Sequence, residues 1–262
     1  MEKLDYLIDY LLKENRGIKV ANIPQSTIEK KNLYRSLCNI REPKPISKYY
    51  LQIENEYLQE ELKKKHITKV EDIQFVKKSN LENKDKMYLW KGDITTLQID
   101  AIVNAANSQG LGCFIPCHKC IDNQINTFAG ISLRLECNEI MKNKNYFLDI
   151  GKAFITEGYN LPVKHVIHTV GPIIYNEVTE KEEKQLKDCY INTLKLAIDK
   201  GIRNIAFPCI STGEFRFPKD RASKIAISAV NNFLKEYRNN FDKVVFNVYG
   251  GEDYNIYERN FK

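Results

Sequence analysis

The sequence predicts an α/β fold, in which helices cover both faces of a central, mixed but mostly parallel sheet, preceded by a small helical extension. Two observations lead to this prediction. From Met87 onward, short apolar runs alternate with longer segments of helical periodicity, which is typical of parallel sheets enclosed by helices. Before about residue 64, three amphipathic segments follow one another instead, and these indicate a small all-helical unit.

Three helices are predicted at the N-terminal end. The first, residues 3–14, places leucines and an isoleucine on one face at helical spacing. The second begins near Ser26, because the run Ser26-Thr27-Ile28-Glu29 fits a capping box. It is stopped by Arg41-Glu42-Pro43-Lys44-Pro45, whose prolines cannot continue a helix. The third begins at Ser47.

The chain is expected to divide near residue 75. Between about residues 64 and 86 the composition turns charged and polar, as in Lys77-Lys78-Ser79-Asn80, which is typical of a domain junction. We therefore expect a helical extension over residues 1–75 and an α/β domain over residues 76–262. The extension is expected to pack on the side of the larger domain as a brace, and the alternative is that it presents a surface to a modified protein.

In the α/β domain, strands and helices are predicted to alternate. Strands are expected at residues 88–90, 101–103, 153–156, 165–170, 204–207 and 244–249. Helices are expected at about residues 122–143, 179–200, 218–237 and 252–260. Thr179 and Glu182 form a second capping box. Because ligands bind beyond the carboxyl ends of parallel strands, we expect a site where the loop after residue 103 meets the loop after Phe207.

Composition narrows the possible functions. The chain has 262 residues, a formal net charge of +6 and a pI near 8.8, but its lysines are dispersed, so no nucleic-acid partner is expected. The apolar runs are far shorter than a bilayer span and the first residues lack a signal-peptide pattern, so we expect a cytoplasmic protein without a membrane partner. Its seven cysteines lack disulfide-framework spacing, which fits a reducing compartment.

A short segment combines three thiols and an imidazole within eight positions, at Cys113, Cys117, His118 and Cys120. Thiolate sulfur and imidazole nitrogen are ligands that zinc prefers. Cys117 and His118 are sequence neighbours whose side chains diverge in most loops, so we predict that Cys113, His118 and Cys120 bind Zn²⁺ and Cys117 does not. Three protein ligands leave a fourth position open, as in catalytic zinc sites. The alternative is a cluster of buried thiols without a metal.

Other candidate residues lie where predicted strands end. Asp93 can accept hydrogen bonds from an amine-bearing ring or form an Asx turn. Asn104 and Asn107 end an apolar strand, where buried polar groups need partners. Asp122 is expected to cap a helix, and beside a metal it can also orient a ligand or a water. Tyr249 can stack on a flat ligand or pack in the core.

The loop after Phe207 carries Ser211-Thr212-Gly213 before a predicted helix. Hydroxyl groups, glycine and a helix N-terminus together can wrap a phosphate, and the alternative is an ordinary strand-to-helix turn. His165 and His168 lie within a predicted strand and are expected to be packing residues rather than metal ligands.

Taken together, these motifs resemble the macrodomain family, which has a three-layer α/β/α fold and binds ADP-ribose. The resemblance rests on Gly92-Asp93-Ile94-Thr95, Asp100-Ala101-Ile102-Val103-Asn104-Ala105-Ala106-Asn107, His168-Thr169-Val170-Gly171-Pro172, and Ile210-Ser211-Thr212-Gly213 with Phe217-Pro218. The run from Gly112 to Asn123 resembles the zinc-dependent branch, whose members also carry a helical N-terminal extension and remove ADP-ribose from proteins.

This resemblance implies a role for each candidate. The adenine would be recognised by Asp93, Ile94 and Tyr249. The diphosphate and adjoining ribose would be wrapped by Ser211, Thr212, Gly213, Glu214 and Phe215. The distal ribose would face Asn104 and Asn107, and the zinc ligands of the family match Cys113, His118 and Cys120.

The implied function is that of a zinc-dependent protein mono-ADP-ribosyl hydrolase, which removes ADP-ribose from modified acidic side chains. Asn104, Asn107 and Asp122 are the catalytic candidates, and zinc would polarise a hydroxyl or bind a water whose pKa it lowers. The alternative is a non-catalytic ADP-ribose-binding module with a structural zinc. The resemblance also implies an ADP-ribosylated protein as substrate, a lipoyl-carrier protein among them, and a sirtuin-like ADP-ribosyltransferase as functional counterpart.

Two residues depart from the family pattern. Asn126 stands where the helix after the metal-binding run often has a histidine, which weakens the case for a base carried by that helix. Arg216 stands where many macrodomains have glycine, so the diphosphate loop is expected to differ in shape or to add a cation near the phosphates.

Overall fold

The central sheet forms from apolar segments that are buried on both faces, as parallel strands require. The computed structural model describes residues 2–15, 17, 23–75 and 79–262. Among them, strands run in the order β2-β7-β6-β3-β5-β4 and β1 pairs with β3. Of these pairings, β4–β5 is antiparallel and the others are parallel, so the predicted mixed sheet is confirmed. The strands are β1 (Thr68–Lys69), β2 (Met87–Lys91), β3 (Leu97–Ala106), β4 (Ala153–Glu157), β5 (Val163–Val170), β6 (Asn204–Phe207) and β7 (Lys243–Val248).

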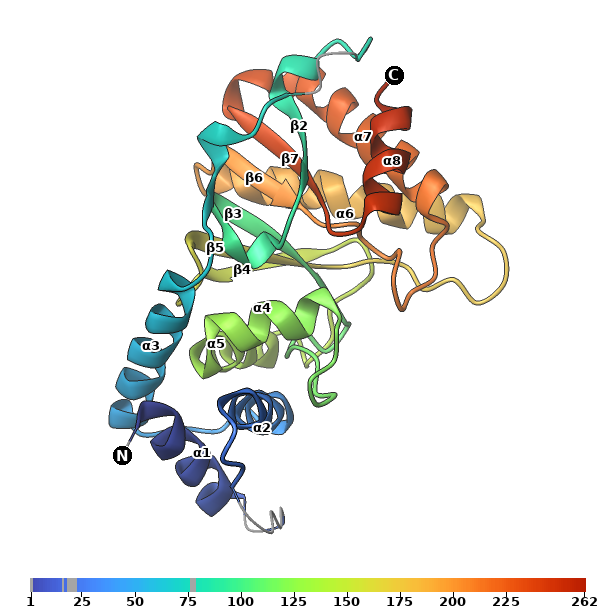
Figure 1. The fold of residues 1–262 in the computed structure, drawn as a ribbon. Helices are drawn as coiled ribbons and strands as arrows, with labels where there is room; N and C mark the ends of the chain where they lie inside the picture. Colours follow the sequence, from blue (N-terminus) through green and yellow to red (C-terminus); the bar gives the residue numbers. More distant parts are fainter. Residues whose placement is uncertain (1, 16, 18–22, 76–78) are drawn as a thin grey trace.

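Helices cover both faces of the sheet (Figure 1). One face carries α4 (Ile121–Ala129) and α5 (Ile131–Lys142), and the other carries α6 (Glu180–Asp199), α7 (Lys219–Tyr237) and α8 (Gly251–Asn260). Each face has its own apolar core, so the predicted three-layer α/β/α architecture is confirmed. Short 3-10 turns are η1 (Val70–Asp72), η2 (Lys84–Lys86), η3 (Ile94–Thr96) and η4 (Arg238–Asn240). In the described ranges, no helix is both long enough and apolar enough to cross a membrane.

The N-terminal helices form a further layer outside α4 and α5 (Figure 1). They are α1 (Lys3–Glu14), α2 (Thr27–Ile40) and α3 (Lys48–Lys63). Their shared core includes Leu7, Ile8 and Tyr50, and also Ile131 from the start of α5. The extension therefore packs directly on the α/β domain. The boundary between residues 75 and 76 stays a prediction, and Lys77 and Lys78 lie outside the described residues.

Two local predictions are wrong. The segment 122–143 is not one helix but two, because the chain breaks at Gly130, whose φ of +92° suits glycine. The N–H of Ile131 donates to Glu54 Oε2 at 2.9 Å, so a residue from α3 caps the new helix. The capping box at Ser26 is also absent. Ser26 and Glu29 are exposed, so water competes for the groups that would close it. The capping box of Thr179 and Glu182 is confirmed.

Candidate functional site

The candidate residues gather at one edge of the sheet. Asp93 follows β2, Asn107 follows β3, residues 208–218 follow β6 and Tyr249 follows β7. Because these strands are parallel, their carboxyl ends meet at the same edge. After the roles predicted for them from the sequence, we call residues 107–120, between β3 and α4, the metal loop, and residues 208–218, between β6 and α7, the diphosphate loop.

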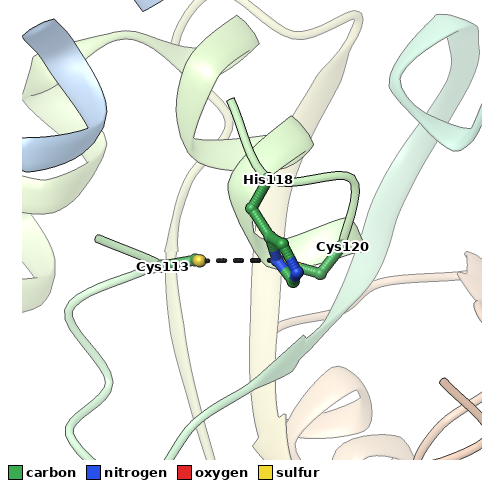
Figure 2. A group of neighbouring side chains, drawn as sticks. All are labelled: Cys113, His118 and Cys120. Carbon is green, nitrogen blue, oxygen red and sulfur yellow. Dashed lines mark hydrogen bonds between the residues drawn. The ribbon is translucent and has the colours of Figure 1, made fainter. Parts of the chain in front are cut away.

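The three predicted metal ligands lie together in the metal loop (Figure 2). The ligand atoms of Cys113, His118 and Cys120 are all within 4.8 Å of one another, and Cys113 Sγ lies 3.7 Å from His118 Nδ1. With zinc–ligand bonds of about 2.3 Å to sulfur and about 2.0 Å to nitrogen, tetrahedral coordination separates the two atoms by roughly 3.5 Å. The donor set and its spacing therefore fit zinc without a large movement of the loop.

Cys117 is turned away from this cluster. Its φ is +53°, and its Sγ donates a hydrogen bond to the carbonyl oxygen of Asn32 in α2 at 3.3 Å. The backbone at Cys117 therefore reverses the loop between Cys113 and His118. This agrees with the prediction that the side chains of Cys117 and His118 diverge.

Cys120, not Asp122, is the N-cap of α4, which corrects the sequence prediction. The Cys120 Sγ accepts the N–H of Asn123 at 3.4 Å. Asp122 lies in the first turn of the helix instead, where its carboxylate is favoured by the helix dipole. Burial raises the pKa of the Cys120 thiol to about 12, so its thiolate form depends on a cation close by.

Asp122 is buried and brings the three catalytic candidates into one hydrogen-bonded group. Its Oδ1 accepts from Asn104 Nδ2 at 2.7 Å and from Asn126 Nδ2 at 3.1 Å, and its Oδ2 accepts from Asn107 Nδ2 at 3.3 Å. Burial raises the pKa of Asp122 to about 6, although the hydrogen bond from Asn104 and the charge of Arg134 oppose the shift. A carboxyl group with a pKa near neutrality suits proton transfer.

Asn104 of β3 lies beside His168 of β5, its partner in the register of the two strands. Asn104 Nδ2 lies 3.1 Å from His168 Nδ1, and His168 Nε2 lies 3.0 Å from Thr156 Oγ1. The imidazole stacks on Phe154 with a centroid distance of 4.6 Å, and burial lowers the pKa of His168 to about 3. His168 is thus a neutral packing residue, as expected, but it also orients Asn104, which sequence reasoning missed.

Three buried polar atoms near the carboxyl edge of the sheet have no hydrogen-bond partner among the residues that the structure describes: Asn104 Oδ1, Asn126 Oδ1 and Ser211 Oγ. Buried polar groups are normally hydrogen-bonded, so these atoms are suited to a polar ligand. Two of them belong to residues predicted to bind ADP-ribose.

Backbone hydrogen bonds hold the diphosphate loop, and one of them comes from the N–H of Ile174, which donates to the carbonyl of Phe215 at 2.8 Å. Ser211 and Arg216 have φ values of +65° and +58°, and the N–H of Phe217 donates to the carbonyl of Ser211 at 2.9 Å. Gly213 and Glu214 are exposed between them, while Thr212 and Phe215 are half-buried. The Glu214 carboxylate lies 3.6 Å from His118 Nε2. The two loops therefore face each other closely.

At the other end of this edge lie the residues predicted to bind adenine. Asp93 Oδ1 accepts hydrogen bonds from the N–H and hydroxyl of Thr95 at 2.9 and 2.7 Å, so it forms the Asx turn that opens η3 with Ile94. Its Oδ2 lies 3.9 Å from Lys65 Nζ, just after α3. Tyr249 is 81% exposed, so the alternative that it packs in the core is wrong.

Comparison with known proteins decides the family. The family described as Macro domain matches residues 103–226. A protein-ADP-ribose hydrolase of Treponema medium is 45% identical over 98% of this chain and 97% of its own length. Another, from Staphylococcus aureus (strain MRSA252), is 44% identical over 99% and 95%. This chain belongs to the macrodomain family. The crystal structure of a Trypanosoma brucei macrodomain in complex with ADP-ribose is also similar, with a TM-score of 0.67 and 28% identity over 86% of this chain and 94% of that one.

The geometry shows what Arg216 and Asn126, the two residues that depart from the family pattern, do in this macrodomain. Arg216 occupies a left-handed conformation, which glycine adopts without strain, so the loop keeps the shape of a glycine position and adds an exposed cation. Asn126 donates to the backbone oxygen of Asp122 at 2.9 Å as well as to its carboxylate. It therefore fixes the carboxyl group, whereas a helix-borne base is not present at this position.

The sequence analysis did not predict four residues of this macrodomain whose side chains contact the metal loop: Arg35, Asn39, Asn123 and Arg134. Asn39 and Asn123 are almost fully buried. The available signal was weak, because an arginine or asparagine on an amphipathic helix normally faces solvent.

Proposed function

We propose that this macrodomain hydrolyses the bond between ADP-ribose and an acidic side chain of a modified protein, using Zn²⁺ held by Cys113, His118 and Cys120. Relatives that are 45% and 44% identical over nearly the whole chain carry the name protein-ADP-ribose hydrolase. One structural observation carries the chemistry. The buried Asp122 carboxyl follows Cys120 by two residues and accepts hydrogen bonds from Asn104 and Asn107.

In this proposal, the residues at the carboxyl edge divide the binding of ADP-ribose. Asp93 and the N–H of Ile94 receive the adenine, and the exposed ring of Tyr249 flanks it. The diphosphate and adjoining ribose are wrapped by Ser211, Thr212, Gly213, Glu214 and Phe215. Support comes from the left-handed turns that expose this loop and from α7, whose N-terminus follows directly and favours negative charge.

Asn104 and Asn107 hold the distal ribose, and Asn104 Oδ1, which no described residue contacts by a hydrogen bond, accepts one from a ribose hydroxyl. Asp122 orients the attacking water and takes up its proton, for which a pKa near 6 is suited. A bound zinc ion supplies Lewis acidity beside this group. Water adds across the ester, so that ADP-ribose leaves and the aspartate or glutamate side chain is restored.

The lipoyl-carrier substrate, the sirtuin-like transferase and the cytoplasmic location stay predictions from the family resemblance. The relatives' names specify an ADP-ribosylated protein in general.

The test combines metal content with turnover. Purified protein is analysed for zinc, and release of ADP-ribose from an aspartyl- or glutamyl-modified protein is followed before and after chelation. We expect about one zinc per chain and a loss of at least 100-fold in turnover after chelation, restored by zinc, because catalytic metals contribute several kcal/mol. Full activity in zinc-free protein would overturn the metal part of the proposal.

A Cys113→Ala variant separates the hydrolase from a non-catalytic ADP-ribose reader. The hydrolase loses turnover in this variant but keeps ADP-ribose affinity, because the adenine and diphosphate contacts lie elsewhere. A wild-type protein that binds ADP-ribose and turns over no ester-linked substrate would instead support the reader.

A further inference from the structure

One face of α2 lies along the metal loop. Three residues at positions i, i+3 and i+7 of the helix, which share a face, make the contacts. The carbonyl of Asn32 accepts from Cys117 Sγ at 3.3 Å, Arg35 Nη2 donates to the carbonyl of His118 at 2.6 Å, and Asn39 Oδ1 accepts the N–H of Cys117 at 2.9 Å. The extension thus holds the peptide that carries a predicted ligand.

Arg35 also fixes a second residue that supports the loop. Its Nε and Nη2 donate to Asn123 Oδ1 at 3.1 and 2.6 Å. Asn123 is fully buried, and its Nδ2 donates to the carbonyl of Ile115 at 2.9 Å while its N–H donates to Cys120 Sγ. Arg35 therefore reaches His118 directly and Cys120 through Asn123.

Arg134 of α5 ties the third ligand to the same helix. Its buried guanidinium donates to the carbonyls of Leu111 at 2.8 Å and Cys113 at 3.3 Å. It also donates to the carbonyls of Cys38 and Asn39, near the end of α2, and to the carbonyl of Arg41, the residue that follows the helix. A cation at a helix C-terminus is favoured by the helix dipole. The Arg134 side chain therefore connects the C-terminal end of α2 to the backbone of Cys113, the first of the three predicted ligands.

We propose that Asn32, Arg35 and Asn39 of α2, with Arg134, form a clamp that sets the positions of Cys113, His118 and Cys120, so that the N-terminal extension is part of the metal site. These are positioning residues, since Arg35 and Arg134 contact the backbone of His118 and Cys113, and Asn32 and Asn39 contact the intervening Cys117. The inference rests on the proposed zinc site. Groups that orient metal ligands are typically worth about 10- to 100-fold in metal affinity.

The clamp makes a reciprocal prediction. If docking of α2 strengthens zinc binding, zinc binding must strengthen docking of α2 by the same factor. The rest of the extension does not depend on these contacts, because its core, formed by residues of α1, α2 and α3 with Ile131 of α5, includes no residue of the metal loop. A change at Arg35 is therefore expected to loosen the loop without unfolding the extension.

The first experiment measures zinc affinity of the full chain by competition with a chromogenic chelator. Arg35→Gln removes the charge and the forked contact, and Lys31→Gln is the matched control, because Lys31 lies on the same helix but pairs with Glu61 of α3. We expect affinity to fall roughly 10- to 100-fold in Arg35→Gln and to stay within about twofold in Lys31→Gln, where only a partly exposed ion pair is lost.

Two failures of this experiment have different meanings. If the wild type binds zinc and Arg35→Gln binds it equally tightly, the clamp is overturned and the proposed hydrolase stands. If the wild type binds no zinc under conditions in which it retains turnover, the metal part of the proposed function falls, and the clamp falls with it.

The second experiment needs no variant. Amide hydrogen exchange is compared between zinc-loaded and chelated wild-type protein. We expect zinc to slow exchange in the second half of α2, residues 33–40, as well as in the metal loop, while the far helix α8 is unchanged. Protection confined to the metal loop would show that α2 and the ligands are uncoupled.

Discussion

The metal loop and the diphosphate loop both follow a parallel strand and meet at the same edge of the sheet, yet they are held in different ways. Side chains from α2 and α5 hold the metal loop, with Asn39 and Arg134 buried against its backbone. Backbone groups hold the diphosphate loop, with Ser211 and Arg216 in left-handed conformations, a hydrogen bond from Phe217 to Ser211 across them, and a second one from the N–H of Ile174 to the carbonyl of Phe215.

This difference suits the two roles that we propose for the loops. A loop that wraps a diphosphate needs exposed backbone N–H groups, so neighbouring side chains must leave it uncovered. A loop that presents soft ligands needs fixed side-chain positions, and buried hydrogen bonds from neighbouring elements supply them. Substitutions in α2 and α5 are therefore expected to disturb the metal loop more than the diphosphate loop.

The largest effect is expected from Arg134→Met. The substitution keeps the apolar stem but leaves five carbonyl oxygens without their donor. Loss of one partner in a buried ionic or hydrogen-bonded network is strongly destabilising, by about 3 to 5 kcal/mol. Urea unfolding measures the change. The same substitution in the diphosphate loop, Arg216→Met, is the control and should change stability by less than about 0.5 kcal/mol, because Arg216 is exposed. Equal effects would remove the distinction between the loops.

The next effect depends on pH and concerns the joint between the extension and α5. Glu54 is buried, where it accepts hydrogen bonds from Tyr34 Oη at 2.7 Å and from the N–H of Ile131. Burial raises the pKa of Glu54 to about 7, against 4.5 for an ordinary glutamate. The folded state therefore binds more protons than the unfolded state between these values, so the stability contributed by this group is present below pH 4.5 and is lost as the pH rises through 7.

Glu54→Gln tests this assignment, since glutamine resembles the protonated acid. We expect the variant to gain stability relative to the wild type as the pH rises from 5 to 8, by roughly 2 to 3 kcal/mol if the full shift applies. Thermal unfolding at both pH values measures the difference. Glu61→Gln in the same helix, at a partly exposed ion pair, is the control. A constant difference between wild type and Glu54→Gln across this range would contradict the raised pKa.

The fold and the three predicted metal ligands could be predicted from the sequence, whereas the clamp that holds the metal loop could not. Continuous apolar runs mark the buried parallel strands, so the fold and the edge where the loops meet follow from the pattern. Cys113, His118 and Cys120 lie close in sequence, so their proximity could also be predicted. The clamp could not, because Asn39 and Cys117 are 78 positions apart, and a polar residue on a helix carries no mark of its distant partner.

The same limit explains why the helix break at Gly130 and the N-cap of α4 were predicted wrongly. Gly130 breaks the helix where Glu54, 77 residues away from Ile131, supplies the new cap. Aspartate is a typical N-cap residue, but Cys120 is the N-cap of α4. The Asp122 carboxylate instead accepts a hydrogen bond from the buried Asn104. In both cases a tertiary contact overrides a sound local preference.

A smaller effect is expected at Arg216. Arg216→Gly removes a side chain from a left-handed conformation, which should stabilise the folded protein by about 0.5 to 1 kcal/mol after the greater freedom of glycine in the unfolded chain is subtracted. Loss of the cation should weaken ADP-ribose binding by roughly two- to fivefold, as for an exposed ion pair. Unfolding and calorimetric titration measure the two effects. Arg216→Ala keeps the strain and loses the charge, so it should show the weaker binding without the gain in stability. A gain in both variants would refute the strain argument.

The smallest effect is expected from Cys117→Ser, which tests the choice of ligands within the metal loop. Serine keeps a donor for the carbonyl of Asn32 and the same backbone conformation, so stability should stay within about 0.5 kcal/mol of the wild type. Zinc stoichiometry and affinity should be unchanged, because the Cys117 side chain is turned toward α2 and not toward the other thiols. Cys113→Ser is the matched substitution, and it should lose most of the zinc because a hydroxyl is a poor substitute for a thiolate. Loss of zinc from Cys117→Ser would mean that the loop rearranges around the ion and that the clamp holds a different set of ligands.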